Sequence, residues 1–171
     1  MPAGHQVVGK TAIGIQGVVR DANDSQPIPE HGVEVFDADF NYIGGVGTDL
    51  SGEYFLAVPA EGDYVVVTAP GQSPYLPEVY QNRLCDLNTC NPTTEGDPVT
   101  VTDGVSTPGI DFDLDTGFTI SGNVTAGGEP VDGVNVCVHL STGEWTGSCG
   151  GTGGGFFTTT ALPATATLPV G

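Results

Sequence analysis

Positive charge is the scarcest property of this chain. Only three of its 171 residues are Lys or Arg, while 21 are Asp or Glu, which gives a formal net charge of -18 at pH 7. A surface with this charge repels phosphate backbones and anionic lipids, so nucleic acid and polybasic docking to a membrane are excluded. The acidic balance is typical of an extracellular protein, a protein of a high-salt environment or a cation binder.

Long apolar segments are also missing. No apolar run approaches the length that spans a membrane, so the sequence predicts no membrane insertion. The opening residues Met1 to His5 contain neither a basic stretch nor an apolar one, so they are not a signal peptide. For an extracellular or cell-surface protein, we therefore expect the secretion signal to lie outside this sequence.

Helical periodicity is the third absence. Short segments of alternating apolar and polar residues recur instead, between turns that use many of the 27 Gly and 13 Pro residues. The clearest is residues 109–115, where Ile110, Phe112 and Leu114 share one face and Asp residues occupy the other. About seven such strands before residue 116 predict an all-β fold built as a β-sandwich.

One strand–turn–strand motif occurs twice. Its first copy is a strand at residues 15–19, a turn containing Pro29 and a strand at 32–36; its second is a strand at 120–124, a turn containing Pro130 and a strand at 133–137. Such a duplication predicts tandem β-sandwich modules arranged in series.

The two predicted modules differ in length. We expect a lead-in at residues 1–11, a first sandwich at 12–116 and a second, incomplete sandwich at 117–171. The second part has no counterpart of the later strands of the first. An open half-sandwich leaves apolar side chains and a strand edge in water. We therefore expect the second module to be truncated, frameshifted or completed by a strand from another chain.

The four cysteines form two close pairs, Cys85 with Cys90 and Cys137 with Cys149. Neither pair has the Cys-x-x-Cys spacing of a zinc knuckle or a thioredoxin site. An even count and local pairing favour two disulfides formed outside the cytosol. The alternative is four unrelated reduced thiols.

The turn and strand sequences of the first module give a family resemblance. The segments GVVRD at 17–21, PEHGVEV at 29–35 and TDLSGEYFLAVPAEGDY at 48–64 resemble the carboxypeptidase regulatory-like domain. This is a prealbumin-like Greek-key β-sandwich related to the collagen-adhesin B-type and SdrD B-like modules of bacterial surface proteins. The resemblance implies that Tyr54 and Leu56 point into the core.

The same resemblance implies a role. It favours a non-catalytic structural or adhesive spacer of a secreted or cell-surface bacterial protein, whose partners are neighbouring domains of the same polypeptide. The alternative is a carbohydrate- or calcium-binding accessory module of a secreted hydrolase, with a glycan or a surface protein as partner. No enzyme activity is expected, and no cofactor other than Ca²⁺ enters the prediction.

Two groups of acidic residues are candidate cation sites. The first is a looser calcium site that uses Asp37, Asp39, Asn41 and Asp49. Because Tyr42 stands where a helix-loop-helix calcium loop needs Gly, the alternative is a set of turn-forming side chains that bond their own backbone. The second group is the Asp ladder of residues 111–115, for which an outward acidic face that discourages edge pairing is an equal explanation.

Three aromatic residues, Tyr75, Tyr80 and Trp145, form the candidate carbohydrate platform. The alternative for Trp145 is packing over a disulfide. A zinc site of the metallocarboxypeptidase type at His31 and Glu34 is excluded, because strand positions three apart face opposite sides. An isopeptide bond from Lys10 is not expected, since the last strand offers Asp where the adhesin family has Asn.

Overall fold

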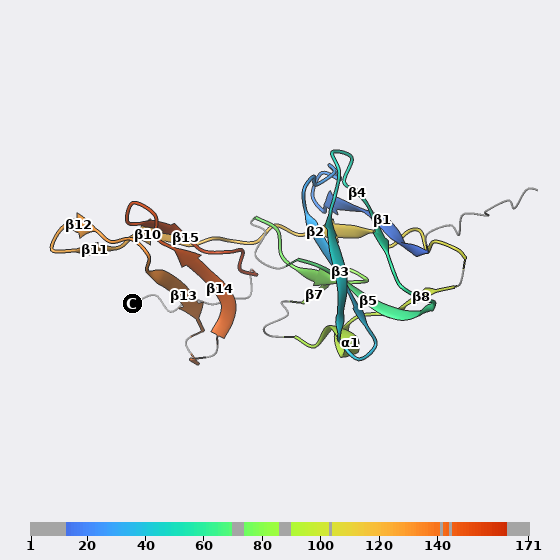
Figure 1. Cartoon of the computed structure of the whole chain (residues 1–171). Helices are drawn as coiled ribbons and strands as arrows, with labels where there is room; N and C mark the ends of the chain where they lie inside the picture. The colour runs from blue at the N-terminus through green and yellow to red at the C-terminus, as the bar shows by residue number, and fades with distance from the viewer. Residues whose placement is uncertain are drawn as a thin grey trace, which may run out of the picture.

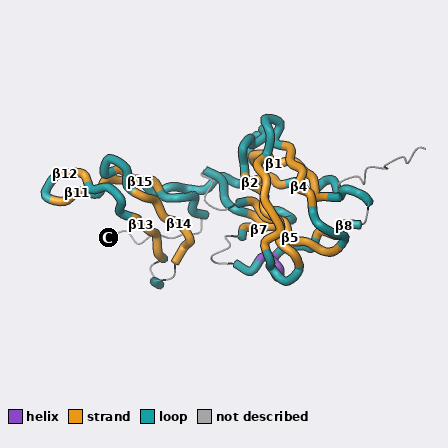
Figure 2. The backbone as a smooth tube through the Cα atoms, viewed as in Figure 1, coloured by secondary structure: helices purple, strands orange, loops and turns teal. Residues whose placement is uncertain are grey.

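The computed structural model describes residues 13–69, 74–85, 90–102, 104–140, 142–143 and 145–163. Within these ranges the chain is nearly all β, which confirms the predicted fold class (Figure 1, Figure 2). The expected lead-in, Lys10 and the last residues of the expected second module lie outside the described residues.

The elements follow one another in short steps. In chain order they are β1 (Gly14–Asp21), β2 (Gly32–Asp37), β3 (Tyr42–Gly47), β4 (Glu53–Ala57), β5 (Gly62–Thr68), β6 (Glu78–Val79), β7 (Arg83–Leu84), α1 (Pro92–Glu95), β8 (Val99–Val101), β9 (Phe112–Leu114), β10 (Ser121–Asn123), β11 (Thr125–Ala126), β12 (Glu129–Pro130), β13 (Asn135–His139), β14 (Trp145–Gly151) and β15 (Phe156–Thr158).

The strands up to β9 form a sandwich of two sheets. One has the order β4-β1-β9 and the other β3-β2-β5-β6-β7, with β8 paired to β5. Alternating side chains from both sheets meet between them, and Tyr54 and Leu56 are buried there as predicted. The largest side chains of this core with no exposed surface are Phe112, Ile15, Leu114, Val19, Val33, Val35 and Val66.

The sandwich carries a second apolar cluster on its outside. Phe36 of β2 and Val65 and Val67 of β5 face away from the main core and pack with Val79 and Cys85. The segment after residue 69, which contains the first cysteine pair, is therefore not one long loop. That segment contains β6, β7 and the single turn of α1, which Asn91 caps by accepting a hydrogen bond from the Thr93 amide.

The strands after β9 form three two-stranded sheets, β10-β15, β11-β12 and β13-β14. Cys137 and Cys149 lie directly opposite each other on β13 and β14 and form one disulfide; Cys85 and Cys90 form the other. Both predicted pairings are present.

The two groups of strands share one register feature. Gly17 of β1 pairs with Tyr54 of β4, and Gly122 of β10 pairs with Phe157 of β15. Both glycines come from the repeated sequence motif. The duplication itself stays a prediction from the sequence, and so do the module boundaries.

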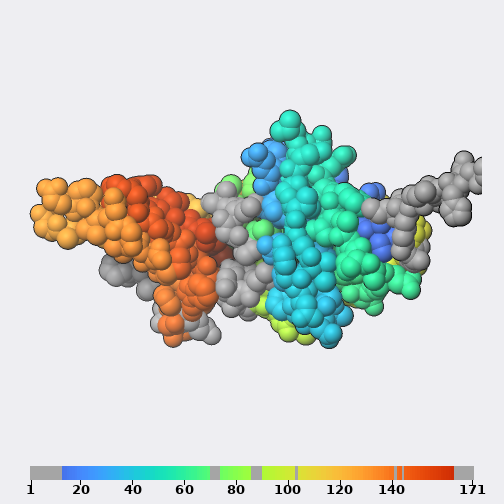
Figure 3. Space-filling model, in the orientation of Figure 1, coloured from blue at the N-terminus to red at the C-terminus, as the bar shows by residue number. Residues whose placement is uncertain are grey.

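The two groups of strands lie end to end in Figures 1 and 3. Tyr75 bridges to Thr116, and the amide of Leu76 donates to the carbonyl of Asp115. Just beyond, the Phe118 and Leu162 amides and carbonyls pair with each other. The chain therefore leaves the first sandwich through hydrogen-bonded backbone.

The carbonyl of Ile110 occupies the space that a side chain at position 17 would fill. A Cβ built on Gly17 lies 1.9 Å from that oxygen. The buried Tyr54 hydroxyl donates a 2.7 Å hydrogen bond to the same oxygen. Gly17 is therefore required for close approach of two backbone segments, and Tyr54 satisfies the carbonyl that is buried by that approach.

We expect Gly17→Ala to destabilise the protein by at least about 2 kcal/mol, because backbone must move to admit the new methyl group. Gly44→Ala is the matched control, since a Cβ on Gly44 meets only the Leu56 side chain at 3.8 Å. Urea unfolding followed by circular dichroism measures both. Equal stability of the two variants would contradict this account of residue 17.

Candidate functional site

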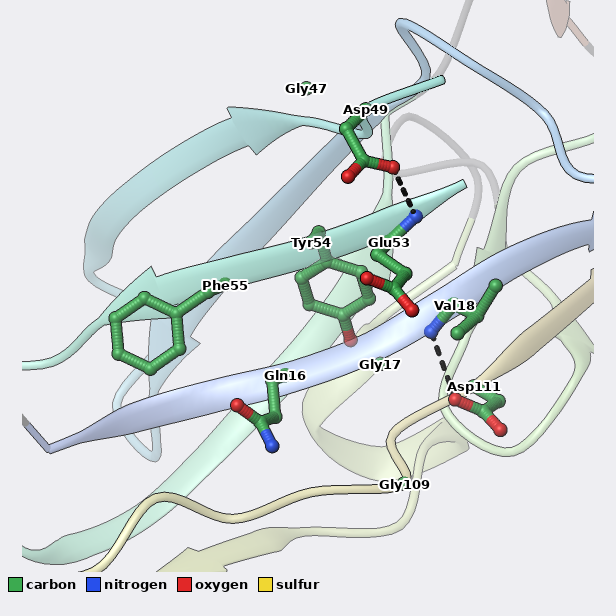
Figure 4. A pocket seen from close by; sticks show the side chains of 10 residues that line it. All are labelled: Gln16, Gly17, Val18, Gly47, Asp49, Glu53, Tyr54, Phe55, Gly109 and Asp111. Carbon is green, nitrogen blue, oxygen red and sulfur yellow. Dashed lines mark hydrogen bonds between the residues drawn. The ribbon is translucent and has the colours of Figure 1, made fainter. Parts of the chain in front are cut away.

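The outer face of the β4-β1-β9 sheet contains a hollow of about 580 Å³ (Figure 4). It crosses β4 and β1 and ends at the segment that leads into β9. Its lining combines one exposed ring, several carboxylates and one amide: Gln16, Gly17, Val18, Gly47, Asp49, Glu53, Tyr54, Phe55, Gly109 and Asp111.

Strand register sets the positions of these side chains. Gln16 lies opposite Phe55, and Val18 lies opposite Glu53, in the antiparallel β1–β4 pair. Successive residues of a strand face opposite sides of the sheet, so these four share the outer face while Ile15 and Tyr54 face the core. The hollow is thus a direct product of two alternating strands.

Phe55 provides the apolar part of the hollow. Its side chain is 43% exposed, although large apolar residues are usually buried. The edge of the ring lies over Gly14, where a Cβ would stand 2.7 Å from the ring. In Figure 4 the ring lies between the ribbons of β4 and β1 and turns one face to the viewer. One ring face is therefore available for contact.

Asp111 forms the opposite end of the hollow. One of its carboxylate oxygens accepts a 2.9 Å hydrogen bond from the Val18 amide, and the other lies 3.7 Å from the Arg20 guanidinium. The side chain replaces a backbone acceptor at the point where the chain bends away from β1. The negative charge of Asp111 is thus already balanced in part by a cation.

The carboxylate of Asp49 also already has hydrogen-bond partners. It accepts hydrogen bonds from the amides of Ser51 and Glu53, which closes the turn before β4. The side chains of Glu53 and Gln16, in contrast, have no hydrogen-bond partner among the described residues. These two are the polar groups of the hollow that remain open to a ligand.

The predicted calcium residues do not come together. Asp37, Asp39 and Asn41 belong to one turn, in which the Asp37 carboxylate accepts bonds from the Asp39 and Asn41 amides and from the Asn41 side chain. These bonds lower the pKa of Asp37. Asp49 belongs to a different turn. Within the described ranges, no three His, Cys, Asp or Glu side chains are grouped so that they could hold a metal ion.

The predicted carbohydrate residues occupy three different settings. Tyr75 packs against the core between the two sheets of the first sandwich. Its ring meets His31 edge-on, and its hydroxyl donates a 3.2 Å hydrogen bond to Asp21. Tyr80 packs edge-on against the core residue Phe112. Trp145 is exposed on β14, in the second group of strands. Sequence reasoning missed Phe55 because the alternation of β4 alone does not distinguish an exposed ring from a buried one.

Two buried titratable groups lie near the joint between the groups of strands. The Glu78 carboxylate accepts a hydrogen bond from the Asp115 amide, and the Asn82 side chain accepts one from the Asp113 amide. The side chains of Glu78 and Asn82 thus supply acceptors to backbone amides along the free edge of β9. Burial, followed by the nearby charges of Asp115 and Asp113, raises the pKa of Glu78 to about 7. One Glu78 oxygen, Oε2, has no described partner.

His31 is the second such group. Its ring is buried, and its Nε2 has no described partner. Burial lowers the pKa of His31 to about 4. The two groups therefore have opposite effects on the pH dependence of stability. Lowering the pH destabilises the fold through the buried neutral His31, and raising the pH destabilises it through the buried Glu78.

Comparison with known proteins identifies no family for this chain. No family model and no curated protein matches it. No helix of the described residues is long and apolar enough to cross a membrane.

Solved structures give distant likenesses only. The Bacillus anthracis TIE protein aligns over 85% of this chain with 11% identity and a TM-score of 0.44. A proposed carbohydrate binding protein from Bacteroides uniformis aligns over 68% with 12% identity and a TM-score of 0.40. A 9R-lipoxygenase from Cyanothece aligns over 67% with 15% identity and a TM-score of 0.32. The chain spans 26%, 48% and 17% of these proteins. At such TM-scores the likenesses assign no function.

We expect Glu78→Gln to remove a pH dependence of stability. The folded wild type retains the Glu78 proton up to about pH 7, whereas the unfolded chain releases it near the ordinary value of 4.5. Wild-type stability should therefore fall, relative to the variant, as pH rises from about 4.5 to 7, by on the order of 3 kcal/mol.

Urea unfolding at a series of pH values measures this difference. Glu61→Gln, at an exposed turn residue, is the control and should leave the pH profile unchanged. A wild-type profile parallel to that of Glu78→Gln above pH 4.5 would show that Glu78 ionises normally in the folded protein.

Proposed function

We propose that this chain is a non-catalytic spacer of a secreted or cell-surface protein and that its first sandwich carries tension between neighbouring domains. The proposal rests on one observation. The first and last strands of the sandwich, β1 and β9, are hydrogen-bonded neighbours that run parallel. The chain therefore enters at one end of this strand pair and leaves at the other.

Parallel terminal strands give a favourable geometry for resisting tension. When the two ends of the chain are pulled apart, β1 and β9 slide along each other, so all the hydrogen bonds between them are strained together. In an antiparallel terminal pair the bonds open one at a time. Since forced unfolding is governed by the unfolding rate, bonds that must break together raise the resistance.

The contact between these segments extends well beyond the three paired residues of β9. The Gln16 amide donates to the Thr107 carbonyl, the Ile110 amide donates to Gln16, and the Ala22 amide donates to Leu114. The Tyr54–Ile110 bond described above adds a link between β4 and the same segment. Sliding of β1 against residues 107–114 must break these bonds as well.

The two disulfides support a location outside the cytosol, where such bonds persist. The sequence resemblance to carboxypeptidase regulatory-like modules supports the same placement. It also supports the spacer role, because related adhesin modules act as stalks.

A second candidate function is carbohydrate binding as an accessory module. The hollow at Phe55 favours it, because it joins an exposed ring face to unpaired polar side chains on a sheet surface. Calcium binding finds less support, since the acidic residues proposed for it are engaged in separate turns.

We expect the first sandwich to unfold at higher force when it is pulled through the two ends of the chain than through residues 13 and 58. In the second geometry β1 and β4 peel apart, because the Val58 amide bonds the Ile13 carbonyl at adjacent strand ends. Single-molecule force spectroscopy with handles on non-cysteine side chains measures both. Equal unfolding forces in the two directions would defeat the spacer proposal.

Tyr54→Phe should lower the end-to-end unfolding force, because it removes the hydroxyl bond to Ile110. Tyr64→Phe is a matched control. It also loses a hydroxyl bond, to the Ala60 carbonyl at 2.8 Å, but that bond lies within one turn and outside the β1–β9 contact. A force drop of the same size in both variants would point to general destabilisation.

The joint after β9 gives a separate prediction. A Cβ on Gly117 would lie 2.8 Å from the Leu162 carbonyl and 2.7 Å from the Leu76 side chain. Gly117→Ala should therefore loosen the contact between the two groups of strands. We expect ¹⁵N relaxation to give one tumbling time for both groups in the wild type and two different times in the variant.

Gly153→Ala is the control for the joint, because a Cβ there meets no atom within 4 Å. It should leave the shared tumbling time unchanged. A wild type whose groups already tumble at different rates would show that the joint is not rigid.

A further inference from the structure

We infer that the hollow over β4, β1 and residues 109–111 binds an uncharged saccharide, stacked on Phe55 and hydrogen-bonded by Gln16 and Glu53. This inference rests on the second candidate function and deepens it by naming the class of ligand and the residues that hold it. The hollow is distinct from the aromatic residues that the sequence alone indicated.

The ring of Phe55 determines the kind of ligand. It lies across the sheet with its edge over Gly14 and one face uncovered, so the ligand must offer a flat apolar surface to that face. A pyranose ring has such a surface, because the C–H groups on one side of the sugar pack well on an aromatic face.

The polar groups next to the ring fit the rest of a sugar. Gln16 lies directly opposite Phe55 and offers both a donor and an acceptor, and Glu53, two residues before Phe55 on the same face of β4, offers acceptors. Neither has a partner among the described residues. Sugar hydroxyls are both donors and acceptors, so they satisfy this mixed set, and the hollow's volume of about 580 Å³ lies within the usual range for ligand sites.

Charge narrows the class to ligands without negative groups. Asp49, Glu53 and Asp111 line the hollow, and the chain has a net charge of -18. The nearby cation Arg20 is already directed to Asp111. Uronic acids and sulfated sugars are therefore repelled. A cation is also attracted to an aromatic face, but the carboxylates of Asp49 and Asp111 are already engaged by backbone amides and Arg20, so the arrangement favours a neutral ligand.

The test is isothermal titration of the full chain with neutral hexasaccharides, cellohexaose, maltohexaose and mannohexaose, beside hexagalacturonate and the glucosamine hexamer. We expect at least one neutral probe to bind and hexagalacturonate not to bind. For the probe that binds, Phe55→Ala should weaken affinity by about tenfold. Gln16→Ala should weaken it as well.

Two further variants keep the result interpretable. Phe55→Leu keeps apolar cover over Gly14 but lacks an aromatic face, so a folded Phe55→Leu protein should also bind weakly. Phe156→Ala removes a similarly exposed ring in the second group of strands and should leave affinity unchanged. Circular dichroism confirms folding of each variant.

Each failure has its own meaning. If none of the saccharides binds the wild type, carbohydrate binding is wrong, while the spacer proposal stands on its force measurements. If a neutral saccharide binds equally to wild type, Phe55→Ala and Gln16→Ala, the assignment to this hollow is overturned. If hexagalacturonate or the glucosamine hexamer binds more tightly than every neutral probe, the uncharged class is overturned.

Discussion

The arrangement of the first sandwich depends on one buried carbonyl. Ile110 brings its backbone oxygen against β1 at the only kind of residue that admits it, Gly17, and Tyr54 supplies the hydrogen bond that the burial requires. Three strands are fixed by this contact, since Tyr54 comes from β4, Gly17 from β1 and Ile110 from the entrance to β9. The bend that follows places Asp111 beside the Val18 amide and so closes one end of the hollow. The closure of the sandwich and the shape of its candidate binding site therefore have the same cause.

The second determinant is the double burial of β5. Residues Tyr64 to Val67 are buried on both faces, which needs a layer outside the sandwich as well as a core inside it. Val79 of the neighbouring strand β6 and the disulfide between Cys85 and Cys90 provide this outer cover over Val65 and Val67. The hairpin of β6 and β7 contributes Glu78 and Asn82, whose side chains cap the free edge of β9. An edge that would otherwise be open to pairing is thus closed by side chains, at the cost of a buried carboxyl group.

Much of this fold could be predicted from the sequence, because the alternation of apolar and polar residues along a strand indicates both the strand and its buried face. The strands of the first sandwich and both disulfides follow from local patterns, and the family resemblance of the turns implied the core positions of Tyr54 and Leu56. The hairpin after residue 69 could not be predicted in this way, since β6 and β7 have two residues each and show no alternation. A signal did exist in the unbroken run of valines in β5, which is typical of a strand covered on both faces. The hollow was missed for another reason: Phe55 and Asp111 are 56 positions apart in the sequence, and only the register of β1 with its neighbours brings them to one surface.

The second group of strands shows what the Tyr54 contact contributes. Phe157 faces Gly122 as Tyr54 faces Gly17, but it has no hydroxyl to offer a third strand, and β10 pairs with β15 alone among the described residues. In the first sandwich the third strand would link the two proposed roles, resistance to tension and ligand binding. A ligand that spans Phe55, Gln16 and the segment beside Asp111 binds only while β4, β1 and that segment keep their register. By thermodynamic linkage, such a ligand stabilises the same register against the sliding that end-to-end tension produces. A stalk module whose ligand binds across its terminal strands is therefore more resistant to unfolding under tension when the ligand is bound.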